Sequence, residues 1–167
     1  MESIYETERL LVRKLVMDDL EQLYEMQGNA NVMRFVKPTV FSYEENKADL
    51  KRVIDLYTMA NNDFFIYAIE RKIDRIFIGS VALVKDNDDD EIGYRFLEKY
   101  WGLGYGSEVV KGLISYSKNI GIEKLIAYVA VENVASRKII EKLGFHFIED
   151  TMCNELQIPE KKYRLQL

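Results

Sequence analysis

The sequence predicts an α/β fold built on a mixed sheet. Three observations lead to this prediction. Runs of β-branched and aromatic residues occupy the middle of the chain, and stretches with helical spacing of apolar residues lie on both sides of them. In the second half, a nearly all-apolar run stands between two helical stretches, which is typical of a strand covered on both faces.

Length and composition indicate one soluble domain, residues 1–167, that is large enough to bury its own core. Hydrophobic residues make up 48% and charged residues 31%, as in ordinary globular proteins. The single cysteine, Cys153, cannot form an internal disulfide, and no cysteine and histidine pattern has metal-ligand spacing. We therefore expect no metal and a reducing compartment.

The N-terminus, the lengths of the apolar runs and the net charge indicate where the protein acts and what it binds. The charged N-terminus has no signal-peptide core, and no apolar run reaches the ~18 residues of a membrane span. These features predict a cytoplasmic protein that does not enter a membrane. The net charge of −5 argues against nucleic acid as the main ligand and favours a cationic partner.

The chain opens with a predicted strand at 8–15, followed by a short helix. Asp18 is the predicted start of that helix, because Glu21 stands three residues later in a capping-box pattern. Gly28 is its predicted end.

A second capping pattern begins a longer helix. Ser42 and Glu45 form it, and apolar residues follow at helical spacing as far as Ala60. Strands at 64–70 and 76–84 come next, and the short polar connection between them predicts an antiparallel pair.

The acidic run 85–90 leads into a further strand at 91–97. Such a run can bind a cation, but a solvated hairpin turn is the simpler interpretation. The remaining predicted elements are a helix ending near Asn119 before Gly121, a strand at 124–131, a helix at 134–143 before Gly144, and strands at 145–150 and 162–167.

The segment "YWGLGYGSEVV" places Gly102, Gly104 and Gly106 before a helix, with Ser107 after them. Glycines at the N-terminus of a helix let main-chain amides approach an anion such as a pyrophosphate. The spacing fits neither the dinucleotide fingerprint nor the P-loop. A tight structural turn, with Gly106 packed against a strand, remains the alternative from this segment alone.

A second segment decides between these two interpretations. In "NVASRKIIEKLGF", Asn133 stands where a strand ends and a helix begins, and Ser136 lies one turn into that helix. Together with "TERLLVRKLVMDDLEQL" and "IGYRFLEKYWGLGYGSEVV", this segment resembles the GNAT superfamily of acetyl-CoA-dependent N-acetyltransferases. The branch that acetylates ribosomal-protein N-terminal serine or alanine, with the related spermidine acetyltransferases, is the most similar. The resemblance covers nearly the whole chain and implies the GNAT fold, with about six to seven strands and about four helices.

The resemblance also implies acetyl-CoA as cosubstrate and assigns its contacts. Amides around the glycine turn would hold the pyrophosphate, and the strand 91–97 would pair with the pantetheine arm and polarise the thioester carbonyl. Asn133 would contact the pantetheine or order the site. The assigned residues are Phe96, Leu97, Trp101, Gly102, Leu103, Gly104, Tyr105, Gly106, Ser107 and Asn133.

Two residues carry the implied chemistry. Ser136 is the position proposed in this branch to protonate the departing thiolate, although a serine in a helix can also bond back to a carbonyl. Glu91 is the candidate base for the amine, and the alternatives are that it merely ends the acidic loop or that water is the base.

Two positions depart from the superfamily pattern. Trp101 replaces its usual glutamine or arginine, so that pyrophosphate binding would rest more on amides. Ile140 replaces the tyrosine acid of many members, which leaves the acid role to Ser136 or water.

The acceptor has no readable signature. A protein N-terminus or a small molecule such as a polyamine presents the required primary amine. Direct transfer is expected, because no base stands beside Cys153, and His146 is interpreted as a residue of a sheet face. A non-catalytic module that binds coenzyme A is the alternative function. A homodimer is compatible with this fold, although no residue indicates one.

Overall fold

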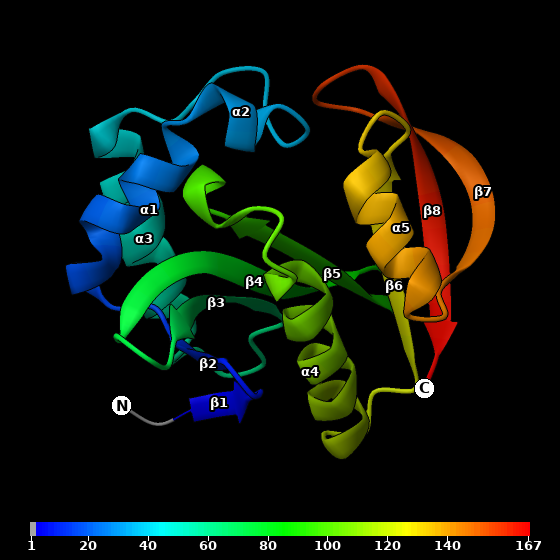
Figure 1. Cartoon of the computed structure of the whole chain (residues 1–167), viewed down its shortest axis with the longest axis horizontal. Coiled ribbons are helices and arrows are strands. Elements are labelled where there is room, and N and C mark those ends of the chain that lie inside the picture. Colours follow the sequence, from blue (N-terminus) through cyan, green and yellow to red (C-terminus); the bar gives the residue numbers. More distant parts are fainter. Residues whose placement is uncertain (1–2) are drawn as a thin grey trace.

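A computed structural model describes residues 3–167 as a mixed sheet of eight strands in the order β1-β2-β3-β4-β5-β6-β8-β7 (Figure 1). Neighbouring strands are antiparallel, except that β5 and β6 are parallel. The strands are β1 (Ser3–Glu6), β2 (Leu10–Lys14), β3 (Phe64–Arg71), β4 (Ile76–Asp86), β5 (Asp89–Phe96), β6 (Lys124–Ala130), β7 (His146–Cys153) and β8 (Ile158–Gln166). The helices are α1 (Leu20–Gln27), α2 (Ala30–Met33), α3 (Tyr43–Leu56), α4 (Tyr105–Asn119) and α5 (Val134–Lys142), and short 3-10 turns span Met17–Asp19 and Glu98–Tyr100. The predicted α/β fold with a mixed sheet is confirmed.

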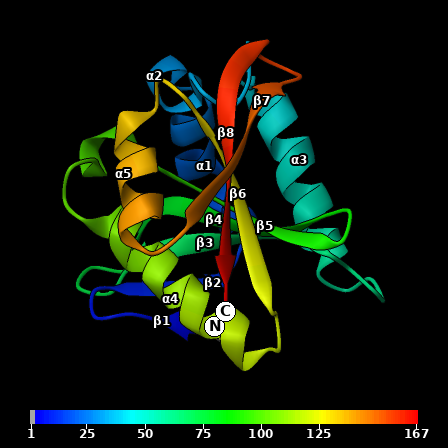
Figure 2. The ribbon, with the colours of Figure 1, turned by 90° about the vertical axis from the view of Figure 1, so that its right-hand side faces the viewer.

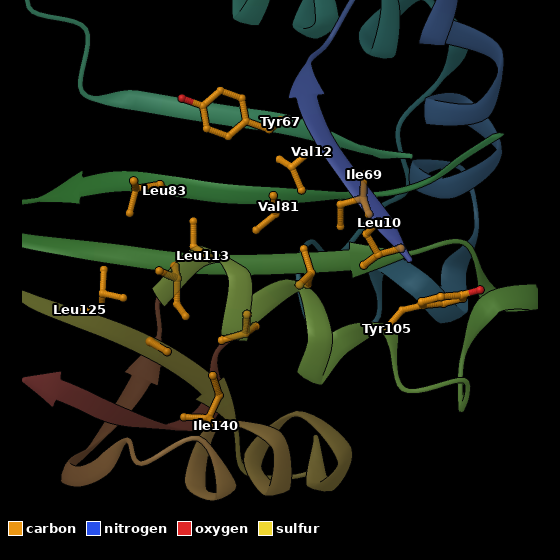
Figure 3. Packing of buried hydrophobic residues seen from close by; sticks show 14 of the residues in the cluster. Leu10, Val12, Tyr67, Ile69, Val81, Leu83, Tyr105, Leu113, Leu125 and Ile140 are labelled. Carbon is orange, nitrogen blue, oxygen red and sulfur yellow. The ribbon is translucent and has the colours of Figure 1, made fainter. Parts of the chain in front are cut away.

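Two hydrophobic cores lie on opposite faces of this sheet. On one face, Leu113 of α4 and Ile140 of α5 belong to one buried cluster with Val81 and Leu83 of β4 (Figure 3). On the other face, residues of α1 and α3 form a second cluster with residues of β3 and β4. Figure 2 shows the sheet between α3 on one side and α4 and α5 on the other. Burial of these apolar faces accounts for the two-layer covering of the sheet.

The strands β5 and β6 pair only near their beginnings. Their parallel register joins Asp90 to Leu125 and Glu91 to Ile126, and beyond these pairs the two strands diverge (Figure 1). The second half of β5 is therefore paired with β4 on one edge and has no strand partner on the other, within the part of the chain that the structure describes. Main-chain groups on that open edge can bind a ligand.

Two short elements were not predicted and explain the difference from the expected counts of strands and helices. In β1 only Tyr5 is buried, so its four residues show no alternation of apolar and polar side chains that could be recognised in the sequence. The Tyr5 hydroxyl donates to the Val109 carbonyl at 3.0 Å. α2 is a single turn held by Asn29, whose side chain accepts from the amides of Asn31 and Val32. Elements of this length are fixed by tertiary contacts and caps rather than by periodicity.

The predicted start of the first helix at Asp18 is wrong. The residue before α1 is Asp19, and its carboxylate caps no amide of that helix. It accepts two hydrogen bonds of 2.8 Å from the buried Arg13 guanidinium and one of 2.9 Å from the Val16 amide. A buried guanidinium requires a carboxylate more than a helix end requires a cap. By contrast, the capping box of Ser42 and Glu45 is confirmed at the start of α3.

We expect Asp19→Ala to lower the free energy of unfolding by about 3 kcal/mol, because Glu70, at 2.8 Å, would be the one carboxylate left to pair with Arg13. Urea denaturation followed by circular dichroism measures this loss. The matched control is Asp18→Ala, which removes an exposed carboxylate and should change stability by less than about 0.5 kcal/mol. A larger loss in the control than in Asp19→Ala would contradict the assignment.

Candidate active site

The glycine turn presents a row of free amides at the start of α4. Gly102 and Gly104 have φ angles of +73° and +83°, a region that side chains rarely allow, and α4 begins directly after Gly104. The first helical bond runs from the Glu108 amide to the Gly104 carbonyl at 3.2 Å. Among residues 3–167, the amides from Gly102 to Ser107 donate no hydrogen bond. Six successive donors without an acceptor, at the positive end of a helix dipole, form a geometry that suits an anion.

Gly106 also has a packing role, as the structural interpretation of this turn expects. A Cβ added there would lie 3.0 Å from Ile139 Cδ1 and 3.3 Å from Tyr94 Cε2, so α4 begins in close contact with both α5 and β5. The side chain of Tyr105 is buried in the core and stacks on Phe96 with a centroid separation of 6.2 Å. Tyr105 and Phe96 can therefore offer a ligand only their main chain.

Arg9 lies beside this turn, and no feature of the sequence identified it. Its Nη1 donates to the Leu103 carbonyl at 3.0 Å, and its guanidinium lies 4.4 Å from the Tyr105 ring centroid. Glu108 holds it through an ion pair of 2.6 Å and also accepts from the Thr7 hydroxyl at 2.6 Å. The turn between β1 and β2 thus brings a guanidinium to the glycine turn, in contact with Leu103 and Tyr105.

The open edge of β5 carries main-chain groups at alternate residues. The Leu97 amide donates to the Ile78 carbonyl at 2.9 Å, so the main chain of Leu97 belongs to the sheet. Because the register pairs Phe96 with Gly79 and Tyr94 with Val81, alternation directs the main-chain groups of Phe96 and Tyr94 away from β4. Trp101 Nε1 donates to the Phe96 carbonyl at 3.0 Å from that open side.

Ser136 meets a residue that the sequence did not single out. Its hydroxyl lies 3.1 Å from the hydroxyl of Tyr94, and its amide donates to Oδ1 of Asn133 at 3.2 Å. Asn133 is the N-cap of α5, so its side chain fixes the turn that carries Ser136. Burial raises the pKa of the Tyr94 phenol, and the bond to Ser136 works against that rise. Two hydroxyls are thus joined beside the diverging strands.

Glu91 lies where β5 and β6 begin to separate, on the face of β5 opposite Tyr94. Burial raises the pKa of its carboxyl to about 7, helped by the negative charges of Asp86 and Glu160 and opposed by Lys162. The neighbouring acids are themselves held, since the Tyr128 hydroxyl donates to Asp86 at 3.0 Å and the Thr151 hydroxyl to Glu160 at 3.2 Å. A carboxyl that titrates near neutrality is suited to accept a proton.

The other candidates lie elsewhere. Ile140 is buried in the core. His146 and Cys153 lie on β7, which β8 and β6 separate from β5. The acidic run forms the ends of β4 and β5 and the turn between them, Asn87 and Asp88. Within residues 3–167 no group of three acidic, histidine or cysteine side chains is placed to hold a metal. No helix of the described chain is long and apolar enough to cross a membrane.

Comparison with known proteins places the chain among acetyltransferases. Residues 9–146 match the family described as acetyltransferase (GNAT) domain. An uncharacterised N-acetyltransferase of Bacillus subtilis, YoaA, is 29% identical over 150 residues, which cover 87% of this chain and 84% of that protein. A GNAT-family acetyltransferase from Bacillus anthracis has a TM-score of 0.84 at 25% identity, with 97% of each chain covered. The ribosomal L7/L12 α-N-protein acetyltransferase RimL, solved with coenzyme A, has a TM-score of 0.84 at 18% identity, with 99% of this chain and 98% of that one covered.

Proposed function

The chain belongs to the GNAT family of acetyltransferases and is an acetyl-CoA-dependent N-acetyltransferase, and on that premise we propose how its site works and on what it acts. The acceptor is a primary amine, of a small molecule or of a protein N-terminus as in the ribosomal-protein acetyltransferases of similar fold. Transfer is direct, from the thioester to the amine. The observation that carries the proposal is the row of unpaired amides before α4, together with the open edge of β5.

The residues present fit acetyl-CoA as substrate. Amides from Gly102 to Ser107 hold the pyrophosphate, with Arg9 as a nearby cation. The main chain of Tyr94 and Phe96 pairs with the pantetheine arm, as an added strand would, and one amide there stabilises the oxyanion. The substrate supplies the acetyl group and a thiolate leaving group.

The chain's own side chains move the protons. Glu91 accepts one proton from the ammonium group, so that the neutral amine can attack and the new C–N bond can form, and the second proton on nitrogen leaves to solvent as the C–S bond breaks. As the C–S bond breaks, Ser136 donates its hydroxyl proton to the thiolate and takes one from Tyr94. Tyr94 is a positioning residue in this scheme, because it orients Ser136 and replenishes its proton, and solvent then restores the proton of Tyr94.

A panel of primary amines tests the function. Purified protein with acetyl-CoA should release free thiol only when an acceptor is added, and mass spectrometry should find one acetyl group on that acceptor. Tight binding of coenzyme A without thiol release on any amine would instead support the non-catalytic module.

We expect Ser136→Ala to lower kcat roughly 100-fold and Tyr94→Phe roughly tenfold, with the affinity for coenzyme A unchanged in both. The physical reason is that the first loses the proton donor and the second only its orientation. Steady-state kinetics of the single variants and of the double variant measure the coupling. If Tyr94→Phe lowers kcat just as much in the Ser136→Ala background, the two hydroxyls do not act together.

A further inference from the structure

Arg95 is a half-buried cation without a carboxylate partner. Its only hydrogen-bonding contact among the described residues is from Nη1 to the thioether sulfur of Met33, at 3.9 Å. No carboxylate of residues 3–167 lies within 4.0 Å of its guanidinium. Buried Arg13, in contrast, is paired with both Asp19 and Glu70 at 2.8 Å. A half-buried guanidinium without an anion is less favourable than a paired one, so Arg95 is available to bind an oxyanion.

The acids nearest to Arg95 are engaged elsewhere. Burial lowers the pKa of the Arg95 guanidinium, and Asp49 is the acidic group that opposes this. Asp49 itself accepts from Arg52 at 2.7 Å. Glu98, just beyond β5, accepts from the side chains of Asn29 and Asn31 at 2.8 and 2.9 Å. Neither Asp49 nor Glu98 is thus free to neutralise Arg95.

Arg95 shares one face of β5 with the candidate base. Alternation along the strand puts Glu91, Gly93 and Arg95 on the same side, facing α2 and away from Tyr94. The Cα atoms of Glu91 and Arg95 are roughly 13 Å apart along the strand, and both side chains are long enough to shorten that gap. A base and an unpaired guanidinium thus stand at the two ends of one row.

The space between these two side chains is open. A Cβ added to Gly93 would meet only the methyl group of Ala82 on β4, at 3.8 Å. The floor of the row is therefore made of two small residues, and no side chain other than that of Ala82 comes within 4 Å of the added Cβ. A small acceptor can lie there with its nitrogen toward Glu91.

From this arrangement, which rests on the proposed acetyl transfer, we infer that the acceptor is a small amine that also carries a carboxylate or phosphate, and that Arg95 binds that oxyanion. A guanidinium recognises either group through paired N–H donors. The overall negative charge of the chain favours a cationic partner, but Arg95 reverses that preference locally. A polyamine, which has no anion, would leave Arg95 unpaired.

Matched acceptors test this inference. Thiol release is measured with an amino acid and its carboxamide, with phosphoethanolamine and ethanolamine, and with spermidine. We expect kcat/KM to be at least tenfold higher for at least one oxyanion acceptor than for its neutral partner, and the responding pair identifies carboxylate or phosphate. Arg95→Met should bring that ratio to about one without changing the KM for acetyl-CoA, and Arg95→Lys should retain part of the preference. Lys51→Met, which removes an exposed cation of α3 and leaves the Asp49–Arg52 pair in place, should keep the full ratio.

The outcomes separate this inference from the proposed function. Turnover that is equal within both pairs, highest with spermidine, or equally selective in Arg95→Met would overturn the inference and leave acetyl transfer intact. If no amine is acetylated, acetyl transfer fails, and calorimetry of the same acceptors on the coenzyme A-bound protein decides about Arg95. Binding of an oxyanion acceptor that Arg95→Met loses would support the inference, and absent or unchanged binding would refute it.

Discussion

Gly104→Val is expected to weaken coenzyme A binding by about 100-fold or more. Gly104 has a φ of +83°, where a β-branched residue is strained, and it is the last residue before α4. Relief of that strain would turn the amides of Tyr105 to Ser107 away from a common point. Loss of two charge-assisted hydrogen bonds, at about 1.5–3 kcal/mol each, corresponds to a change of that size or larger. Titration calorimetry with coenzyme A measures it directly.

The same helix offers a matched control at its other end. Gly121 has a φ of +84°, and a Cβ added to it would have no atom within 4 Å, so Gly121→Val introduces comparable backbone strain away from the turn. Both variants should lose similar stability, while only Gly104→Val should lose coenzyme A. Equal loss of affinity in both variants would refute the pyrophosphate assignment.

The substrate itself can be shortened to locate the effect. Acetyl-pantetheine lacks the pyrophosphate, so kcat/KM for this compound should be nearly the same in wild type and in Gly104→Val. Gly104 is a better test position than Gly106, because a side chain at Gly106 would also push against Tyr94 and Ile139. A defect at Gly106 would therefore mix altered packing around Ser136 with lost binding.

The sequence correctly predicted the strands and helices that are determined by interactions between neighbouring residues. Alternating and β-branched runs indicated the central strands, and the capping box of Ser42 and Glu45 located the start of α3. The Asp18 prediction failed because Asp18 lies inside a 3-10 turn, Met17–Asp19, that precedes α1. Arg13 of β2 holds the carboxylate of Asp19 in that turn. Propensity and caps describe neighbours along the chain and not such tertiary partners.

The site residues also divide into those that a contiguous motif identifies and those that only tertiary contacts reveal. Motif spacing identified the glycine turn, Asn133 and Ser136, each of which belongs to a contiguous segment. Tyr94 is 42 residues from Ser136, and Arg9 is 94 residues from Leu103, so their contacts depend on the finished sheet. The alternation of β5 was visible in the sequence and places Arg95 on the side of Glu91. The lack of a carboxylate partner for Arg95 among residues 3–167 is visible only in the folded protein.

Glu91→Gln is expected to lower kcat/KM by roughly 100-fold or more at pH 8, because the amide cannot accept the proton of the acceptor. In wild type, turnover should rise with pH through about 7, where the Glu91 carboxyl loses its proton. That rise should disappear in Glu91→Gln, and the remaining rate should follow the pKa of the acceptor amine alone. A pH profile of kcat/KM between 5.5 and 9, with acetyl-CoA saturating, measures both effects.

Stability should change in the opposite direction to activity, which distinguishes a base from a carboxylate that only ends the acidic loop. The pKa of Glu91 is about 7 in the folded protein and near 4.5 when exposed, so the folded state binds more protons between these values. The stability contributed by the protonated carboxyl is therefore complete below about pH 4.5 and lost as the pH rises through about 7. Glu91→Gln removes the buried charge and should raise the free energy of unfolding at pH 8 by on the order of 2 kcal/mol. A variant that is fully active with an unchanged pH profile would show that Glu91 is not the base and would leave that role to water. A variant that is less stable at pH 8 would contradict the raised pKa of Glu91.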